Sequence, residues 1–230
     1  MSKKFTIEET KEIFYHLCRA GLGEGSRCRQ PIFFAQAILG EKYGSFHPFI
    51  THRPTDSKAT KAKRRKTKKE VIKVLDDYKV PYTFTKHGTL YVTTIETANN
   101  RKEILTEALN PKKSIINHAI LGIACGFPLE DIFKFLKTTE QKCSRSELDE
   151  LVQMYFPNYK PWDELGTPLP KKVIGSLKNP SRFLSKLESL MLFSCYNKKR
   201  NKKIKMIYAN TIYSLLGAEV MEEYIINGYV

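Results

Sequence analysis

The chain has 230 residues, of which 41% are hydrophobic and 27% are charged, so it can fill the core of one domain or of two small ones. This composition excludes collagen-like, low-complexity and wholly disordered proteins, and no apolar run reaches the roughly 20 residues that a membrane span requires. The unusual quantity is charge, because 39 lysine and arginine residues against 24 aspartate and glutamate residues give a formal net charge of +15.

The positive charge is concentrated in two segments. Lys58 to Lys73 holds nine basic residues and one acid, and Lys198 to Lys205 holds six basic residues and no acid. These segments, the first and second basic clusters, carry +8 and +6, which leaves about +1 for the rest of the chain. Such dense clusters create local fields that attract phosphates or other acidic groups.

The N-terminal region is predicted to form two helices. Thr6 and Glu9 have the spacing of a capping box, which predicts a helix that runs to about Arg19 and stops at a glycine-rich segment. A second helix is predicted over 31–43, with Pro31 in its first turn. Because this helix is apolar on nearly every side, we expect it to lie in the core.

A long helix is predicted next, after a linker or irregular strand over 45–56. Asp56 or Ser57 can cap this helix, which extends to Lys79. Its apolar residues recur at helical spacing only from Val71 onward. We therefore expect only the second half of the helix to pack against the body.

A β-hairpin is predicted directly after the long helix. Residues 82–94 combine β-branched and aromatic side chains on either side of a His87-Gly88 turn. A basic helix followed by a hairpin partly resembles the order of recognition helix and wing in winged-helix proteins. In that fold the preceding helix is only a short turn away, whereas here residues 43–56 intervene.

Helical patterns dominate the rest of the chain. The predicted helices cover 98–109, 114–125, 129–136, 144–155, 180–196 and 205–226. We expect a mainly α fold with one β-hairpin, an α+β chain with a helical bundle-like body. Its predicted parts are an N-terminal body over 1–156, a proline-rich connection over 157–170 and a C-terminal helical subdomain over 171–230.

The first basic cluster is the strongest functional feature of the sequence. Its charges fall on every face of the predicted helix, which favours contacts with phosphates over the reading of bases. A solvated helix end or a nuclear-import sequence, KAKRRKTKK, would explain the same residues. The predicted nucleic-acid-binding residues of this cluster are Lys58, Lys61, Lys63, Arg64, Arg65, Lys66, Lys68 and Lys69.

The second basic cluster lies between two apolar helical segments, where we expect a loop. Tyr196 and Tyr208 flank it, and a basic groove with stacking aromatics is typical of single-strand or RNA binding, although core packing explains these tyrosines more simply. We expect the two clusters to lie close together and form one positive surface. The predicted binding residues here are Lys198, Lys199, Arg200, Lys202, Lys203 and Lys205.

Two weaker patterns concern anions and metals. A glycine-rich segment over 21–26, followed by Arg27, Arg29 and a helix start, is a possible anion site, but a plain helix-to-helix connection is the simpler interpretation. The potential zinc ligands lack the close first pair of ordinary finger sites, and they are Cys18, Cys28, His47 and His52. We therefore expect no metal and no cofactor.

The sequence contains no familiar catalytic motif, neither a G-x-S-x-G nucleophile turn nor an H-E-x-x-H metal motif. We expect a non-enzymatic protein that binds RNA or DNA mainly through backbone phosphates, as an accessory component of a larger nucleoprotein machine. One alternative is a nuclease or other nucleic-acid-processing enzyme, whose candidate residues are Glu41, His52, Asp56 and Asp76. The other is an inhibitor or adaptor, including a virus-encoded one, that binds a nucleic-acid-handling protein.

Cysteine usage and the N-terminal sequence bear on location. The five cysteines form an odd count without close pairs. The N-terminal MSKKFTIEET lacks the charged-then-apolar pattern of a secretion signal. We therefore expect an intracellular protein, cytoplasmic or nuclear, with no membrane partner.

Overall fold

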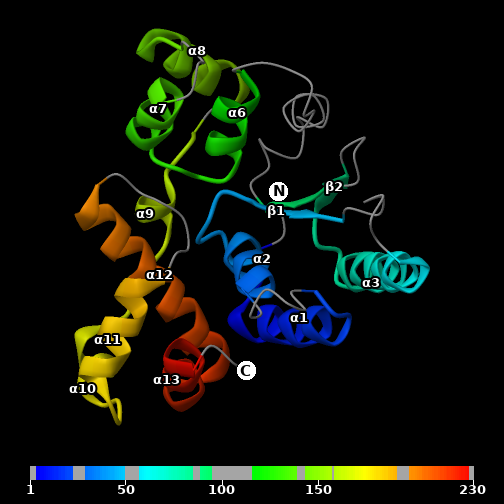
Figure 1. Ribbon diagram of the computed structural model, residues 1–230, viewed down its shortest axis with the longest axis vertical. Helices are drawn as coiled ribbons and strands as arrows, with labels where there is room; N and C mark the ends of the chain where they lie inside the picture. The colour runs from blue at the N-terminus through cyan, green and yellow to red at the C-terminus, as the bar shows by residue number, and fades with distance from the viewer. Residues whose placement is uncertain are drawn as a thin grey trace.

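The fold is mainly α with one small antiparallel sheet, as predicted. A computed structural model describes residues 4–22, 29–49, 57–84, 89–94, 116–138, 143–156, 158–190 and 197–227. Figure 1 shows α1, α2, α3 and the sheet as one group, with α6, α7 and α8 gathered beyond the sheet and the C-terminal helices beside α1 and α2. Among the described helices, none has both the length and the apolar composition that crossing a membrane requires.

Helices α1 (Ile7–Arg19) and α2 (Arg29–Leu39) pack against each other at the N-terminal end of the chain. The predicted capping box is confirmed. The backbone N–H of Glu9 donates to Thr6 Oγ1 over 3.2 Å, and the Thr6 N–H donates to a Glu9 carboxylate oxygen over 2.9 Å. These two bonds satisfy amides that the first turn of a helix would otherwise leave without partners.

The sheet has three strands, β1 (Ser45–Pro48), β2 (Tyr82–Phe84) and β3 (Thr89–Val92), in the order β1-β3-β2. The predicted hairpin strands are β2 and β3, and their turn lies outside the described residues. Of the two predictions for 45–56, a linker or an irregular strand, the strand is present at its beginning as β1, which pairs antiparallel with β3. The Gln30 side chain supports this strand by donating to the Phe46 carbonyl over 2.6 Å.

The two faces of β3 pack on different groups of helices. Leu90 and Val92 belong to the apolar cluster that contains α1, α2 and the second half of α3. Tyr91 lies on the opposite face, where it packs in a second cluster with α6 and its Oη donates to the Ala124 carbonyl over 3.0 Å. Because successive side chains of a strand point to opposite faces, β3 packs on α1, α2 and α3 with one face and on α6 with the other.

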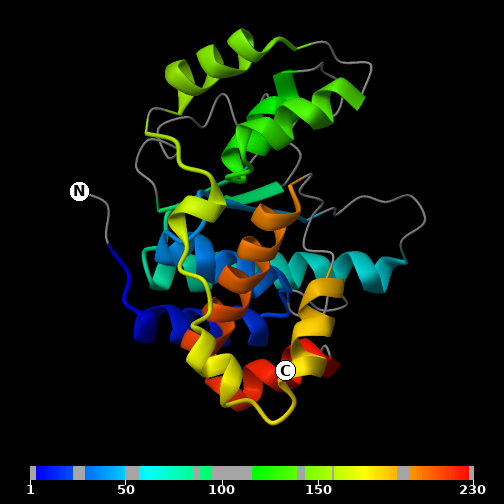
Figure 2. The same cartoon turned by 90° about the vertical axis from the view of Figure 1, so that its left-hand side faces the viewer.

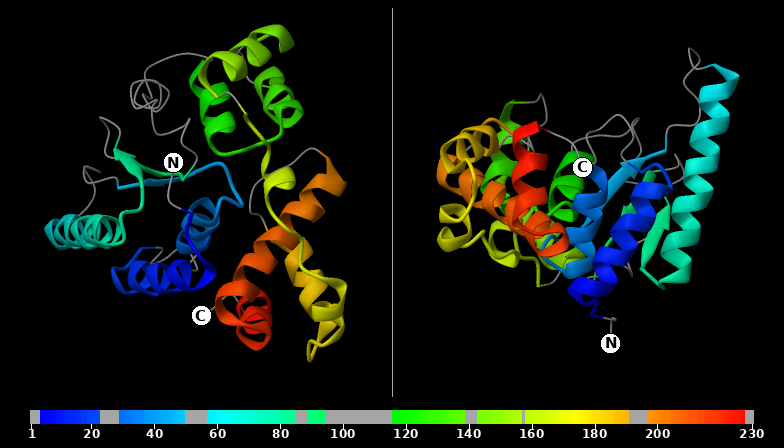
Figure 3. Two further views of the ribbon diagram at one scale, coloured as in Figure 1. Left: turned by 180° about the vertical axis from the view of Figure 1, so that it is seen from behind. Right: turned by 90° about the horizontal axis from the view of Figure 1, so that it is seen from below.

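Helix α3 (Lys58–Asp77) is anchored by its C-terminal half, as predicted. Ser57 caps its first turn by accepting from the Thr60 N–H over 3.1 Å, and Val71 and Leu75 are fully buried. Its N-terminal end projects beyond the other elements in the views of Figures 2 and 3. The winged-helix order is not confirmed, because β1 lies between α2 and α3 in place of a short turn.

Helices α6 (Ile116–Ala124), α7 (Leu129–Thr138) and α8 (Arg145–Tyr155) form the group beyond the sheet. Ser144 and Glu147 make the capping box of α8, in which the Glu147 N–H donates to Ser144 Oγ over 3.1 Å. The predicted helix over 98–109 lies outside the described residues.

The C-terminal helices are α9 (Trp162–Leu165), α10 (Lys171–Gly175), α11 (Pro180–Ser189), α12 (Lys198–Leu216) and α13 (Ala218–Asn227). All of them except α9 contribute to one apolar cluster with α1 and α2, and Trp162 of α9 lies in a smaller cluster with Ile204 and Ile207. Phe14 and Ile32 lie in the same cluster as Tyr208 and Ile212. The single helix predicted over 205–226 is wrong, because Gly217, at φ +87°, separates α12 from α13.

Candidate nucleic-acid interface

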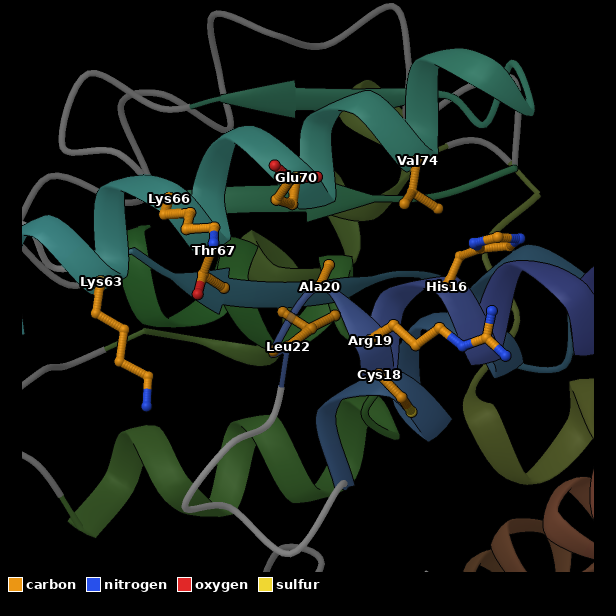
Figure 4. A pocket seen from close by; sticks show the side chains of 11 residues that line it. His16, Cys18, Arg19, Ala20, Leu22, Lys63, Lys66, Thr67, Glu70 and Val74 are labelled. Carbon is orange, nitrogen blue, oxygen red and sulfur yellow. The ribbon is translucent and has the colours of Figure 1, made fainter.

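A groove of about 770 Å³ lies between the C-terminal end of α1 and the middle of α3. Figure 4 shows Lys63, Lys66 and Thr67 on α3 facing the end of α1. The groove is lined by His16, Cys18, Arg19, Ala20, Gly21, Leu22, Lys63, Lys66, Thr67, Glu70 and Val74. It therefore combines part of the first basic cluster with the last turn of another helix.

The charge of this groove is positive. Arg19, Lys63 and Lys66 contribute three cations, and Glu70 is the one acid among its lining residues. The carbonyl end of the α1 dipole disfavours anions, and the positive charge of Arg19 in the last turn of α1 offsets that field. A ligand with closely spaced negative charges, such as a phosphate backbone, suits such a groove.

The remaining residues of the first basic cluster surround α3. Lys58, Arg65 and Lys69 are exposed, as are Lys63, Lys66 and Lys73 on neighbouring positions. The side of α3 toward the body carries half-buried members, which are Lys61, Arg64 and Lys68. Cations on all sides of one helix present many possible phosphate contacts and little that selects a base.

One of the half-buried cations has an aromatic neighbour on β2. The Nζ of Lys68 lies 4.3 Å from the centroid of the Phe84 ring. The ring face attracts the ammonium group, and such a contact contributes about 0.5–1 kcal/mol at exposed sites. Lys68 is thereby placed on the side of α3 that faces β2, away from the groove beside α1.

The second basic cluster is the beginning of α12, and the expected loop is wrong. The Asn197 side chain caps this helix by accepting from the backbone N–H groups of Lys199 and Arg200, over 3.0 and 3.2 Å. The buried residues Ile204, Ile207 and Tyr208 then hold the helix against the body. Helix formation therefore continues through the charged segment because its cap and its apolar stripe support both ends.

Two members of the second basic cluster serve the fold. Arg200 lies 3.2 Å from a Glu130 carboxylate oxygen on α7 and 3.4 Å from a carboxylate oxygen of Asp163 on α9. Lys205 is buried, and its Nζ donates to the Glu188 carbonyl. Burial lowers the pKa of Lys205, and the nearby Glu188 carboxylate opposes that shift. The exposed members are Lys198, Lys199, Lys202 and Lys203.

The two basic clusters do not form one surface, and that expectation is wrong. Figure 1 places α3 and α12 on opposite sides of the molecule, and the view from below in Figure 3 agrees. Helices α1 and α2 lie between them. Tyr208, which flanks the second cluster in sequence, is buried and shares a 3.0 Å hydrogen bond with Tyr224. Tyr196 lies outside the described residues.

The predicted anion and metal residues are only partly described. Arg27, Cys28 and His52 lie outside the described residues, and Arg29 begins α2. His47 lies in β1 with its ring 4.6 Å from that of Phe49, and burial lowers its pKa to about 4. Within the described ranges, no three His, Cys, Asp or Glu side chains are grouped as a metal site requires.

The two described members of the nuclease hypothesis have different surroundings. A carboxylate oxygen of Glu41 accepts from Thr211 Oγ1 on α12 over 2.7 Å, and burial raises the pKa of Glu41. Asp76, near the end of α3, accepts from the Tyr82 hydroxyl over 2.9 Å. Asp56 and His52 lie outside the described residues. No carboxylate pair is therefore available in the basic groove of the described chain.

Arg19 is the groove residue that sequence reasoning missed. It is an exposed cation in the last turn of α1, where basic residues are common because they offset the helix dipole. No short-range pattern relates it to α3, which begins 39 residues later. Only the packing of α1 against α3 brings Arg19 into the lining of the same groove as Lys63 and Lys66, where its guanidinium group extends toward His16 in Figure 4.

The groove and the projecting half of α3 together define a surface rich in basic side chains. We compared the chain with protein-family models, with curated proteins and with solved structures, and none of the three comparisons found a match.

Proposed function

We propose that the chain is a non-enzymatic protein that binds nucleic acid mainly through backbone phosphates. The observation that carries the proposal is a helix that is basic on all sides, beside a groove whose lining includes Lys63, Lys66 and Arg19. Counterion release makes such contacts favourable without any sequence preference. An accessory role in a larger nucleoprotein complex inside the cell fits a surface of this kind.

The exposure of the first basic cluster supports this function. Fixed cations that repel each other raise the free energy of an isolated helix, and a polyanion relieves that repulsion. The projecting half of α3 also carries the positive end of the helix dipole, which adds to the field at its tip. Both terms favour the binding of anions, and the spread of the cations along α3 favours a chain of phosphates over a single anion.

Charge reversal on α3 tests the proposal. In K58E/R65E/K69E, three exposed cations change sign, and the apolar residues that anchor α3 stay intact. The affinity for mixed-sequence nucleic acid should fall, and the log-log salt slope should become shallower by about 2.1–2.7, since each of three lost phosphate contacts contributes roughly 0.7–0.9. Fluorescence anisotropy over a salt series measures both quantities.

The matched control is K171E/K172E/K186E, which changes the net charge equally through exposed lysines on α10 and α11. It should retain most of the affinity and slope. Equal losses in the two variants would show that net charge alone attracts nucleic acid. No binding by the intact protein would contradict the proposed function and would favour a protein partner for the basic surface.

A further inference from the structure

The cations on the projecting half of α3 form two flanks. Successive residues of a helix are about 100° apart, so positions two apart face nearly opposite directions. Lys63 and Lys66 face the groove beside α1. Lys61 and Lys68 come two positions before and after them and face the other side, where Lys68 lies over the Phe84 ring. We call these pairs the α1 flank and the β2 flank.

A crest of exposed residues separates the two flanks. Lys58, Ala62, Arg65 and Lys69 recur there at spacings of three or four residues, and all are exposed. Ala62 lies at the middle of this crest, so a short side chain faces outward between longer ones that can turn toward either flank. A crest of this shape allows the helix backbone to approach the floor of a groove closely.

The charge along α3 limits which part can approach phosphates. From Lys58 to Lys69 the helix contains no acid, and it rises about 17 Å over this length. Exposed carboxylates of Glu70, Asp76 and Asp77 follow and repel phosphates. The part suited to binding is therefore the same part that projects from the body in Figure 2.

We propose that the N-terminal half of α3 inserts into the major groove of duplex DNA, with the two flanks contacting the phosphates of opposite strands. The inference rests on the proposed function and names the form of nucleic acid. A helix with its side chains is about 10–12 Å across, and the B-form major groove is about 12 Å wide. A single strand offers one backbone, and the major groove of duplex RNA is too deep and narrow to admit the helix.

The test compares duplex DNA, single-stranded DNA and duplex RNA of one sequence by fluorescence anisotropy over a salt series. The variants are K63Q/K66Q for the α1 flank, K61Q/K68Q for the β2 flank, and all four together. On duplex DNA each pair should reduce the salt slope by about 1.8, and the reductions should add, because each lost contact contributes about 0.9. The intact protein should bind duplex DNA at least about tenfold more tightly than duplex RNA.

A second variant probes insertion without changing charge. A62L retains a good helix former on an exposed position and places a larger side chain on the crest. It should weaken binding to duplex DNA and leave single-strand binding unchanged, whereas S185L, on the exposed face of α11, should affect neither. Circular dichroism and thermal melting establish that each variant is folded.

The outcomes separate this inference from the function on which it rests. Equal binding to all three nucleic acids, or losses in the flank variants that are equal on single and double strands, would overturn insertion while leaving phosphate binding in place. Undiminished duplex binding by A62L would also overturn insertion. Failure of the intact protein to bind any of the three would contradict the proposed function itself.

Discussion

The two basic clusters occupy the same position in their helices and have different surroundings. Each begins at the first residue of a long helix whose C-terminal half is packed. In α3 no residue is buried before Val71, and the charged half projects from the body. In α12 burial begins at Ile204, and two cations of the cluster hold neighbouring elements.

This difference shows that the density of charge in a sequence does not give the field that a ligand meets. In α12, Arg200 is neutralised by Glu130 and Asp163, and Lys205 is withdrawn from solvent. In α3, Lys58, Arg65, Lys66 and Lys69 are exposed, and no residue of the cluster before Val71 is buried. The clusters should therefore respond oppositely to mutation, with stability affected in α12 and binding affected in α3.

The largest expected effect on stability is at Arg200. R200M leaves the Asp163 carboxylate, whose side chain is 9% exposed, without its ion-pair partner. We expect the free energy of unfolding to fall by about 2 kcal/mol, because a carboxylate that is buried and loses its counterion keeps its desolvation cost. Urea unfolding followed by the fluorescence of the buried Trp162 measures this change.

Two further variants sharpen that comparison. R65M makes the same substitution on exposed α3 and should change stability by less than about 0.5 kcal/mol. The double variant R200M/D163N removes both charges and should recover most of the loss, as expected when an uncompensated charge is the cause. Equal stability of R200M and R65M would mean that the ion pair on α12 contributes nothing.

A smaller effect, with a pH dependence, is expected at Lys205. K205M keeps the apolar stem and loses the hydrogen bond to Glu188, which should cost about 1 kcal/mol at neutral pH. Burial lowers the pKa of Lys205, so in the range between its folded value and 10.5 the folded state binds fewer protons than the unfolded state. The stability contribution of this lysine therefore rises with pH across that range.

The expected result is that the deficit of K205M grows as the pH approaches 10.5. Chemical unfolding at several pH values between neutral and 10.5 measures the difference between the variant and the parent. The matched substitution K69M, on the exposed crest of α3, should give a small difference that stays constant. A deficit of K205M that shrinks with pH would contradict the assigned direction of the shift.

The parts of the fold that short-range patterns determine could be predicted. The capping boxes at Thr6 and Ser144 involve residues three positions apart, so the sequence displays both partners together. The anchoring of α3 from Val71 onward follows from apolar spacing in the same way. The pairing of β1 could not be foreseen, because its four residues pair with β3 more than 40 positions later and the Gln30 side chain holds them there.

In the candidate site too, features set by short-range patterns could be predicted, and features set by tertiary packing could not. The exposure of the first basic cluster follows from the absence of an apolar stripe before Val71, whereas the contribution of Arg19 depends on tertiary packing. Arg200 forms ion pairs with two acids that lie 70 and 37 positions earlier in the sequence, Glu130 and Asp163. A charged run shows no sign in its own sequence of partners so distant.

The smallest expected effect concerns the exposed lysines of the second basic cluster. K198Q/K199Q/K202Q removes three of them without touching Arg200 or Lys205. On a short duplex bound at α3, the affinity and the salt slope should change little, because α12 lies across the molecule and exposed charges beyond about 10 Å are largely screened at 0.1 M salt. K171Q/K172Q/K186Q, with the same change in net charge, should behave alike. A slope reduced by two or more in the first variant alone would mean that the duplex reaches both clusters, and one shared interface would then replace the separation between α3 and α12.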